Sequence, residues 1–372
     1  TLSVVRNNEV ISQGKIEYLF TFKGLKKDPI QQTQIGDIVA LTGFSHTKIG
    51  DTLTSPDKPD PLPALLIAEP TIQVQISPST SPLVGQEGKL TTSRQIKQRL
   101  EKELETNVSL RLSPGPTGET FMVSGRGELH LAILIETMRR EGFEFSVSRP
   151  EVIFKTIKGV PSEPWELLTV EVPEKFTGVI IDTLGQRKAE MINLQNLSLG
   201  VRLEYKIATR NSLGLRSEFL TKTSGLALVH SIFLGYRPQA PAINLIRNGA
   251  LVATQPGQAL AYSIEHIQKH GLTFIPPGEK VYSGMIVGQN SRPGDLWINI
   301  CKGKKLTNMR AAAADAALHI APPVILSLEQ SLNFLGPDEL LEVTPKHLRL
   351  RKRHLNHSTS RLTASSHPPF KL

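Results

Sequence analysis

Cysteine is nearly absent from this 372-residue sequence, which contains only Cys301. A single cysteine excludes a disulfide framework within the chain, and such frameworks are typical of small secreted domains. The sequence therefore predicts a protein of a reducing compartment. With 39% hydrophobic residues, 28 glycines and 26 prolines, the composition is that of a globular protein that can bury several cores, and the length predicts two to four domains.

Long apolar runs are also missing. The longest of them, such as residues 131–135, are far too short to cross a bilayer, so we expect no membrane partner. The first residues lack the basic and apolar stretches of a secretory signal peptide. The sequence starts with Thr1 instead of Met, which favours a fragment or a truncated gene product.

The sequence lacks the motifs of common catalytic sites. No Gly-x-x-x-x-Gly-Lys-Ser/Thr stretch offers a backbone cradle for nucleotide phosphates, and no Gly-x-Ser-x-Gly elbow is present. Cys301 has no Cys or His at the spacing of a zinc site. His130 lies in a predicted helix, where a lone histidine is more often structural than catalytic. We therefore predict no catalytic, cofactor-binding or metal-binding residue in this chain.

Basic charge is concentrated at the end of the chain. The formal net charge is +9, and residues 344–372 contain seven Lys/Arg and no Asp/Glu, which is +7 of that total. A basic end predicts a polyanionic partner, with nucleic acid first, although a solvated tail that aids solubility is the alternative. Residues 348–351 alternate as in a half-buried strand whose charges would face a phosphate backbone. The candidates for RNA contact here are Lys346, Arg349, Arg351, Lys352 and Arg353.

A second basic region spans residues 289–310, where five Lys/Arg stand against the single acid Asp295. Lys and Arg suit phosphates, Asn suits sugar and base edges, and Trp297 could stack on a base. The alternative is an ordinary exposed hairpin in which Trp297 is buried. The candidates for RNA contact in this region are Asn290, Arg292, Lys302, Lys304, Lys305, Asn308 and Arg310.

Strand and helix patterns predict an α+β multidomain protein. Strand-like runs and turn signals favour part of a small β-barrel at the start, followed by a proline-rich linker. We predict a partial β-barrel at 1–62, a ferredoxin-like α+β domain at 63–155, a second at 156–238, a C-terminal α+β domain at 239–355 and a disordered tail at 356–372.

Two segments with matching entries carry the ferredoxin-like prediction. Glu-Pro pairs at 69–70 and 163–164 each lead into an alternating strand and then a helix. The first such helix opens with the capping spacing Thr92-x-x-Gln95. We expect further helices at 128–141, 178–184 and 216–221. In the last region we expect an amphipathic helix at 258–269, an alanine-rich helix at 311–318 and a helix capped by Ser327.

Residues 124–131, Ser-Gly-Arg-Gly-Glu-Leu-His-Leu, resemble the signature of the third domain of elongation-factor-G-like GTPases. The next residues, through Gly142, look like the TypA/BipA branch in particular. Four further stretches are similar to that branch, at 216–221, 233–238, 303–311 and 351–355. The resemblance runs from about residue 14 to residue 355.

This resemblance implies a fold and a function. Members of the family carry a GTPase domain that uses GTP and Mg²⁺, a β-barrel, two ferredoxin-like domains and a C-terminal domain unique to the branch. They bind the ribosome, and a C-terminal loop reaches toward the A-site tRNA. That loop would be residues 290–308 here. The implied partners are large-subunit rRNA and A-site tRNA, and the implied roles are translation, stress response and assembly of the large subunit. We expect a monomer in the bacterial cytoplasm, with features of a cyanobacterial lineage, or in the chloroplast stroma of a plant.

The sequence departs from the family in what it contains. The GTPase motifs are absent, the barrel begins partway through, and Ser212 stands where the family usually has a glycine. The leading hypothesis is therefore the ribosome-binding portion of a TypA/BipA-type factor. One alternative is part of a complete GTP-hydrolysing factor, truncated by sequencing or supplied in trans. The other is a degenerate remnant without function.

Overall fold

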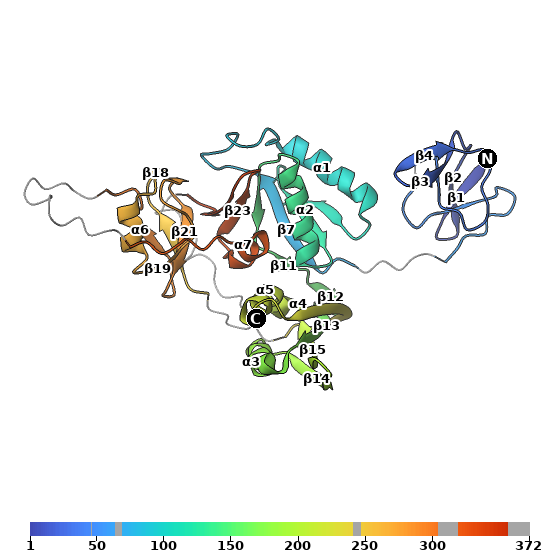
Figure 1. Cartoon of the computed structure of the whole chain (residues 1–372). Helices are drawn as coiled ribbons and strands as arrows, with labels where there is room; N and C mark the ends of the chain where they lie inside the picture. Colours follow the sequence, from blue (N-terminus) through green and yellow to red (C-terminus); the bar gives the residue numbers. More distant parts are fainter. Residues whose placement is uncertain (46, 64–68, 241–246, 304–318, 356–372) are drawn as a thin grey trace, which may run out of the picture. The chain divides into compact units, whose positions relative to one another are not determined.

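The structure is a computed structural model, and it describes residues 1–45, 47–63, 69–240, 247–303 and 319–355 (Figure 1). The chain forms two compact units. The first comprises Thr1–Ala68 with Lys102–Ser109, and the second comprises Glu69–Glu101 and Leu110–Leu372. Within the described part of the chain, no helix is long and apolar enough to cross a membrane.

Two small antiparallel sheets build the first unit. One has the order β2-β1-β6 and the other the order β4-β3-β5, with the strands β1 (Leu2–Arg6), β2 (Glu9–Gly14), β3 (Leu19–Lys23), β4 (Lys26–Pro29), β5 (Val39–Leu41) and β6 (Thr52–Thr54). Asn7 and Asn8 turn β1 into β2 at φ values of 49° and 67°, which asparagine tolerates better than most residues. Arg6, the last residue of β1, donates two hydrogen bonds of 2.7 Å to Asp51, which lies just before β6. In the residues described, the two sheets form no closed barrel.

The first of the two predicted ferredoxin-like domains follows along the chain. Its elements are β7 (Ile72–Pro78), α1 (Ser93–Thr106), β8 (Arg111–Pro114), β9 (Phe121–Gly125), α2 (Glu128–Arg140) and β10 (Phe145–Ser148). The strand order β10-β7-β9-β8 is that of a β-α-β-β-α-β fold, so the prediction is confirmed. Ile96 and Leu100 of α1 are buried, and α2 ends before Gly142, whose φ of 92° suits glycine. A short strand, β11 (Glu151–Val152), also pairs with β7.

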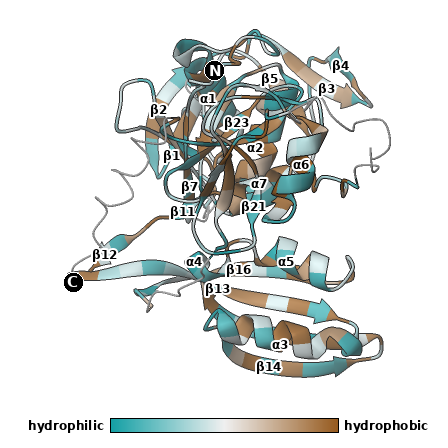
Figure 2. Cartoon of the chain, turned by 90° about the vertical axis from the view of Figure 1, so that its left-hand side faces the viewer, coloured by the Kyte–Doolittle hydropathy of each residue, from teal (hydrophilic) through white to brown (hydrophobic). Residues whose placement is uncertain are grey.

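The second ferredoxin-like domain repeats the arrangement with its own sheet. Its elements are β12 (Lys155–Ile157), β13 (Val160–Val172), a 3-10 turn (Glu174–Phe176), α3 (Thr177–Gln186), β14 (Glu190–Leu197), β15 (Gly200–Ala208), α4 (Thr209–Ser212), α5 (Leu215–Lys222) and β16 (Leu228–Pro238). The order β16-β13-β15-β14 again confirms the predicted fold. Ile180 of α3 and Phe219 of α5 belong to one buried core with Val170 and Leu203 of the sheet. Helices α3 and α5 lie beside this sheet (Figure 2).

Ser212 does not disturb this domain. It is the last residue of α4, and its hydroxyl donates to the carbonyl of Thr209 at 2.9 Å. The tight turn falls two residues later, at Gly214, where φ is 76°. The residue that departs from the family therefore stands where no glycine is needed.

The C-terminal region extends the sheet of the first ferredoxin-like domain. Its elements are β17 (Ala250–Ala253), β18 (Gly257–Gln258), α6 (Ala261–Ile267), β19 (Gly271–Thr273), β20 (Lys280–Val281), β21 (Met285–Asn290), β22 (Leu296–Ile298), α7 (Leu328–Phe334), β23 (Glu339–Val343) and β24 (Leu348–Lys352). β23 pairs with β10, for example Val147 with Leu341, so β22-β17-β21-β24-β23 continues into β10-β7-β9-β8. The sequence did not predict this shared sheet, and the domain boundaries drawn from it stay a prediction.

Two helices of this region test the local predictions. Ser327 caps α7 through a capping box with Gln330, as expected. Helix α6 is shorter than the predicted 258–269, because the chain first forms β18 and because β19 follows at Gly271. The predicted helix at 311–318 lies outside the described residues.

Candidate RNA-binding surface

Asn290 shapes a turn at the end of β21. Its side-chain nitrogen donates to the carbonyl of Gly294 at 2.9 Å, and its oxygen accepts the Arg292 N–H at 3.4 Å. The side chain is 9% exposed, so its amide is occupied by the turn. Arg292, which follows, is exposed. The predicted RNA contact of Asn290 stays a prediction, while the geometry assigns it a structural role.

The segment after this turn is not the hairpin considered as the alternative. β22 runs parallel to β17, and β17 separates it from β21. Trp297 is half-buried in this edge strand. Asn299 is engaged locally, because it donates to Gln255 at 3.0 Å and accepts the Cys301 N–H at 3.0 Å. Lys302 is exposed. The remaining candidates, Lys304, Lys305, Asn308 and Arg310, lie outside the described residues.

Strand β24 contradicts the expectation that its charges face outward. The strand lies inside the sheet, between β21 and β23, and is buried on both faces instead of half-buried. Arg349 is 6% exposed, Arg351 1% and Lys352 2%. The expectation was wrong because an alternating pattern does not show whether a strand has an open face. β24 is an interior strand covered on both faces, so none of its charged side chains faces solvent. Of the candidate cations in and beside this strand, only Arg353, just after it, and Lys346, before it, are exposed.

Each buried cation of β24 is held by named partners. Arg349 donates to Glu87 at 2.5 Å and to Glu342 at 3.2 Å. Burial alone would raise the pKa of Glu87, but hydrogen bonds from Thr344, Arg349 and His347 outweigh it and lower that pKa to about 2. Arg351 donates to the hydroxyls of Thr80 and Ser146, and burial lowers its pKa.

Lys352 of β24 forms ion pairs with three acids, one of which, Asp295, belongs to the 289–310 region. Its ammonium lies 2.5 Å from Asp295, 3.0 Å from Asp338 and 2.9 Å from Glu339. Burial opposes the charge, but Glu339 and Asp295 keep the pKa of Lys352 above its usual value. Arg247 donates to both oxygens of Glu339 at 2.6 and 2.8 Å. The single acid of the 289–310 region is therefore paired with a buried lysine.

Four candidate cations remain at the surface of the described chain: Arg292, Lys302, Lys346 and Arg353. No salt bridge to any of them occurs among the described residues. Because Asp295 is paired with Lys352, it does not directly neutralise Arg292 or Lys302. These four side chains are the part of the predicted site that the structure leaves accessible to a polyanion.

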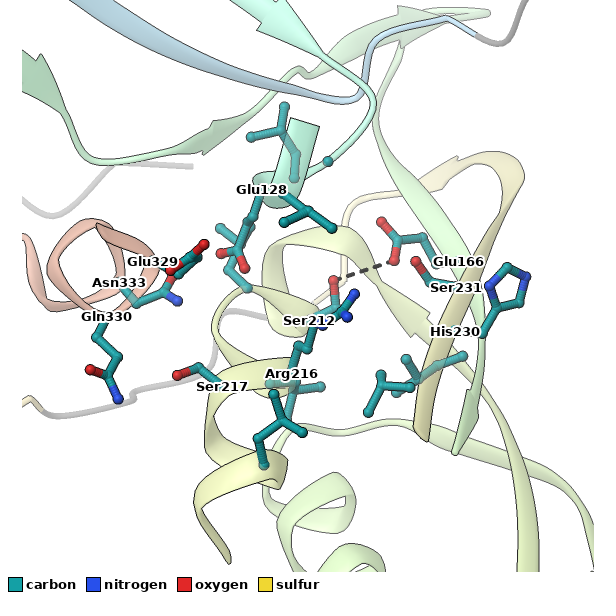
Figure 3. Close-up of a pocket in the computed structure, with 18 of the residues that line it drawn as sticks. Glu128, Glu166, Ser212, Arg216, Ser217, His230, Ser231, Glu329, Gln330 and Asn333 are labelled. Carbon is teal, nitrogen blue, oxygen red and sulfur yellow. Dashed lines mark hydrogen bonds between the residues drawn. The ribbon is translucent and has the colours of Figure 1, made fainter. Parts of the chain in front are cut away.

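The second unit contains a cavity of about 750 Å³ that no sequence pattern predicted (Figure 3). Its walls come from the start of α2, from α5, β13 and β16, and from α7. The polar side chains that line it include Glu128, Glu166, Ser212, Arg216, His230 and Glu329. Burial raises the pKa of Glu128 to about 7 and also raises the pKa of Glu166. One residue in the sequence could have indicated this cavity: Glu128, the acid at the start of α2 within the motif of residues 124–131.

His130 has a structural contact. Its Nδ1 accepts the N–H of Arg126 at 3.3 Å, across the start of α2. In the described part of the chain, no group of three or more His, Cys, Asp or Glu side chains could hold a metal ion.

Two family models match the chain. Residues 248–357 match the TypA/BipA C-terminal domain, and residues 161–245 match the elongation factor G C-terminus. The chain is 46% identical over 351 residues to the large ribosomal subunit assembly factor BipA of Synechocystis sp., and 43% identical over 357 residues to that of Bacillus subtilis.

This chain belongs to the TypA/BipA family. The two alignments cover 94% and 95% of the chain but only 59% and 58% of the relatives. This chain therefore spans less than two thirds of the length of the curated relatives that it matches. The second ferredoxin-like domain coincides with the elongation factor G match, and the region from β17 to β24 coincides with the TypA/BipA match.

Proposed function

We propose that this chain is the ribosome-binding part of a TypA/BipA-type factor that acts in assembly of the large ribosomal subunit, in the cytoplasm. The observation that carries the proposal is identity of 46% and 43%, through almost the whole chain, to proteins named as large ribosomal subunit assembly factors. Roles in stress response and an origin in a cyanobacterium or a plastid belong to the same proposal.

The RNA contact in this proposal is made by exposed cations. Arg292, Lys302, Lys346 and Arg353 would meet phosphates of rRNA or A-site tRNA. Lys304, Lys305 and Arg310, which lie outside the described residues, belong to the same proposed phosphate contact, and Asn308, also outside them, would contact sugar or base edges. Arg349, Arg351 and Lys352 are buried, and they are paired with Glu87, Asp338 and Glu339 or hydrogen-bonded to hydroxyl groups, so the proposal assigns no phosphate contact to them. We propose that the chain binds as a monomer.

GTP hydrolysis enters the proposal only through a longer polypeptide or a partner. The sequence has no P-loop, whose backbone and lysine hold the phosphates and whose Ser/Thr holds Mg²⁺. GTP and Mg²⁺ would therefore bind to residues outside this sequence. The chain alone is expected to bind ribosomes without turning over GTP.

Co-sedimentation with ribosomes in a salt series tests the proposal. A variant with Arg292, Lys302, Lys346 and Arg353 changed to Gln removes four exposed charges and leaves the buried ion pairs intact. If these four meet phosphates, the slope of log K against log salt should become shallower by about 0.7 to 0.9 for each phosphate that is no longer neutralised. At low salt, we expect binding of the variant to weaken by at least about tenfold.

The matched control removes four other exposed cations. Changing Lys89, Arg94, Lys175 and Lys188 to Gln lowers the net charge equally but lies away from β21, β22 and β24 in the sequence. The control should keep the salt slope of the unaltered chain. Equal slopes for all three proteins would remove the four cations from the account. Failure of the unaltered chain to pellet at any salt concentration would contradict ribosome binding by this part alone.

A further inference from the structure

One hydrogen-bonded contact joins the two ferredoxin-like domains at the cavity. Glu128, the first residue of α2, accepts the N–H of Gly214 with both carboxylate oxygens, at 3.0 and 3.2 Å. Gly214 stands just before α5 with φ of 76°. A side chain of the first domain therefore holds the backbone of the second, across 86 positions of sequence. Figure 3 shows the Glu128 carboxylate pointing into the cavity beside Glu329.

Hydrogen bonds from Arg187 hold the loop that carries the Gly214 N–H. Arg187, at the end of α3, donates to the carbonyl of Asn211 at 3.1 Å and to that of Leu213 at 2.7 Å. A second guanidinium nitrogen of Arg187 donates to Glu218 of α5 at 2.7 Å. On the other side, a Cβ at Gly214 would lie 3.3 Å from the side chain of Asn333 in α7. Hydrogen bonds of Arg187 therefore tie the loop that carries this donor to α3 and α5, and α7 lies close to it.

The surroundings of Glu128 disfavour its negative charge. Burial raises its pKa most, the hydrogen bond from Gly214 and the charge of Arg187 lower it, and Glu166 and Glu329 raise it further. Other charged or titratable groups that line the cavity are Arg216 of α5, His230 of β16 and Arg126 just before α2, and all three are exposed. An ionised Glu128 therefore shares this cavity with two other carboxylates.

We propose that Glu128 is a latch between the two ferredoxin-like domains. The joint between these domains, defined by the contact of Glu128 with Gly214, is closed when the Glu128 carboxyl is protonated. When the proton leaves, the joint opens to water. Opening separates the Glu128 carboxylate from the Gly214 N–H and hydrates the carboxylate. The second domain has its own sheet, whereas the first shares a sheet with the C-terminal region. Release of the latch would therefore let the second domain move against the rest of the second unit.

The direction of the pH dependence follows from linkage. In the closed joint the pKa of Glu128 is about 7, and in an open, hydrated joint it would return toward the ordinary value of 4.5. An acid whose pKa is raised in the closed state favours closure at low pH, and that advantage is lost as pH rises from about 4.5 to about 7. Between pH about 5 and about 8, the ratio of closed to open joints should fall by a factor on the order of 50 to 100.

Energy transfer between two dyes measures this ratio. One dye is attached to a Thr137→Cys variant at the end of α2, and the other to Asn193→Cys on β14. Cys301→Ser removes the natural thiol. Both labelling positions are exposed. The unaltered latch should show a loss of the closed population as pH rises from about 5 to about 8. No change over this range would overturn the proposal.

Glu128→Gln is the decisive variant, because its amide oxygen still accepts the Gly214 N–H but cannot ionise. At pH about 8, this variant should keep the energy transfer that the unaltered protein shows at pH about 5. Glu329→Gln is the control, since it removes a charge from the same cavity without touching Gly214. It should keep the transition, with a smaller amplitude because Glu329 contributes to the raised pKa of Glu128. A Glu128→Gln protein that follows the unaltered one, or a control that abolishes the transition equally, would refute the latch.

Hydrogen exchange of the Gly214 amide gives a second readout in the unaltered chain. Corrected for its intrinsic pH dependence, exchange at Gly214 should speed up across the same pH range as the loss of energy transfer. A purely structural contact would stay protected throughout and would overturn the proposal. This measurement decides the question even where the substitution prevents folding.

Discussion

Strand β24 and the segment after β21 have similar basic sequences and opposite surroundings. Arg351 and Lys352 are 1% and 2% exposed, whereas Arg292 and Lys302 are exposed. β24 lies between two hydrogen-bonded neighbours, while the other segment forms a turn and an edge strand. Both regions contain enough basic residues to predict RNA contact. Whether those charges can reach a partner depends on the position of the strand in its sheet.

The two regions should also differ in energetics. A buried cation is costly unless acids or other acceptors surround it, so removal of one partner leaves an uncompensated charge. An exposed cation is hydrated, and its replacement changes stability little. The comparison thus predicts large losses of stability for changes around β24 and small ones for changes around Arg292.

The largest loss is expected for Glu339→Ala. The Glu339 carboxylate is 0% exposed and accepts hydrogen bonds from Arg247, Lys352 and the N–H of Gly336. Its removal leaves two cations short of their central partner, so the free energy of unfolding should fall by about 3 to 5 kcal/mol. Urea unfolding followed by circular dichroism measures this.

Asp338→Ala is the matched control. Asp338 pairs with the same lysine, Lys352, but its side chain is 40% exposed. Its loss should therefore cost below about 1 kcal/mol. Equal losses in the two variants would show that burial does not set the strength of this cluster and would break the comparison.

A smaller and pH-dependent loss is expected for Glu87→Gln. The pKa of Glu87 is about 2 in the folded chain against an ordinary 4.5, so its contribution is present above pH 4.5 and is lost as pH falls toward about 2. At pH about 7, the variant should lose about 2 kcal/mol, and the difference from the unaltered chain should vanish near pH about 2. Unfolding midpoints over this range test the expectation.

The control for this variant is Glu101→Gln on α1. Glu101 is 53% exposed and, among the described residues, forms a salt bridge with Lys97 at 3.7 Å in the same helix. It should be indistinguishable from the unaltered chain at both ends of the pH range. A Glu87→Gln protein that lost stability equally at every pH would separate the effect from ionisation of Glu87.

Local sequence signals predicted the elements and both ferredoxin-like folds well. The Thr92-x-x-Gln95 spacing and the Ser327 cap both mark helix starts in the structure. Such signals succeed because capping and periodicity depend on residues within a few positions of one another. The strand order then followed from matching β-α-β units.

Long-range pairing could not be predicted in the same way. The joining of Val147 to Leu341 depends on two strands almost 200 residues apart, and no local pattern encodes that partner. The burial of Arg351 follows from this pairing, and so does the acid cluster around Lys352. The contact of Glu128 with Gly214 also joins distant segments. For these sites, the residue types can be read from the sequence, but the role of each residue depends on which distant segments pair in the fold.

The smallest effect on stability is expected for the double variant Arg292→Gln with Arg353→Gln. Both side chains are exposed and neither has a salt bridge among the described residues, so the free energy of unfolding should change by no more than about 0.5 kcal/mol. The same variant should bind ribosomes more weakly at low salt, because fewer counterions are released on binding when two cations are missing. A loss of stability above about 1 kcal/mol would show that these exposed charges also support the fold. In that case the contrast with β24 would be one of degree, and weaker ribosome binding by this variant could no longer be assigned to the charges alone.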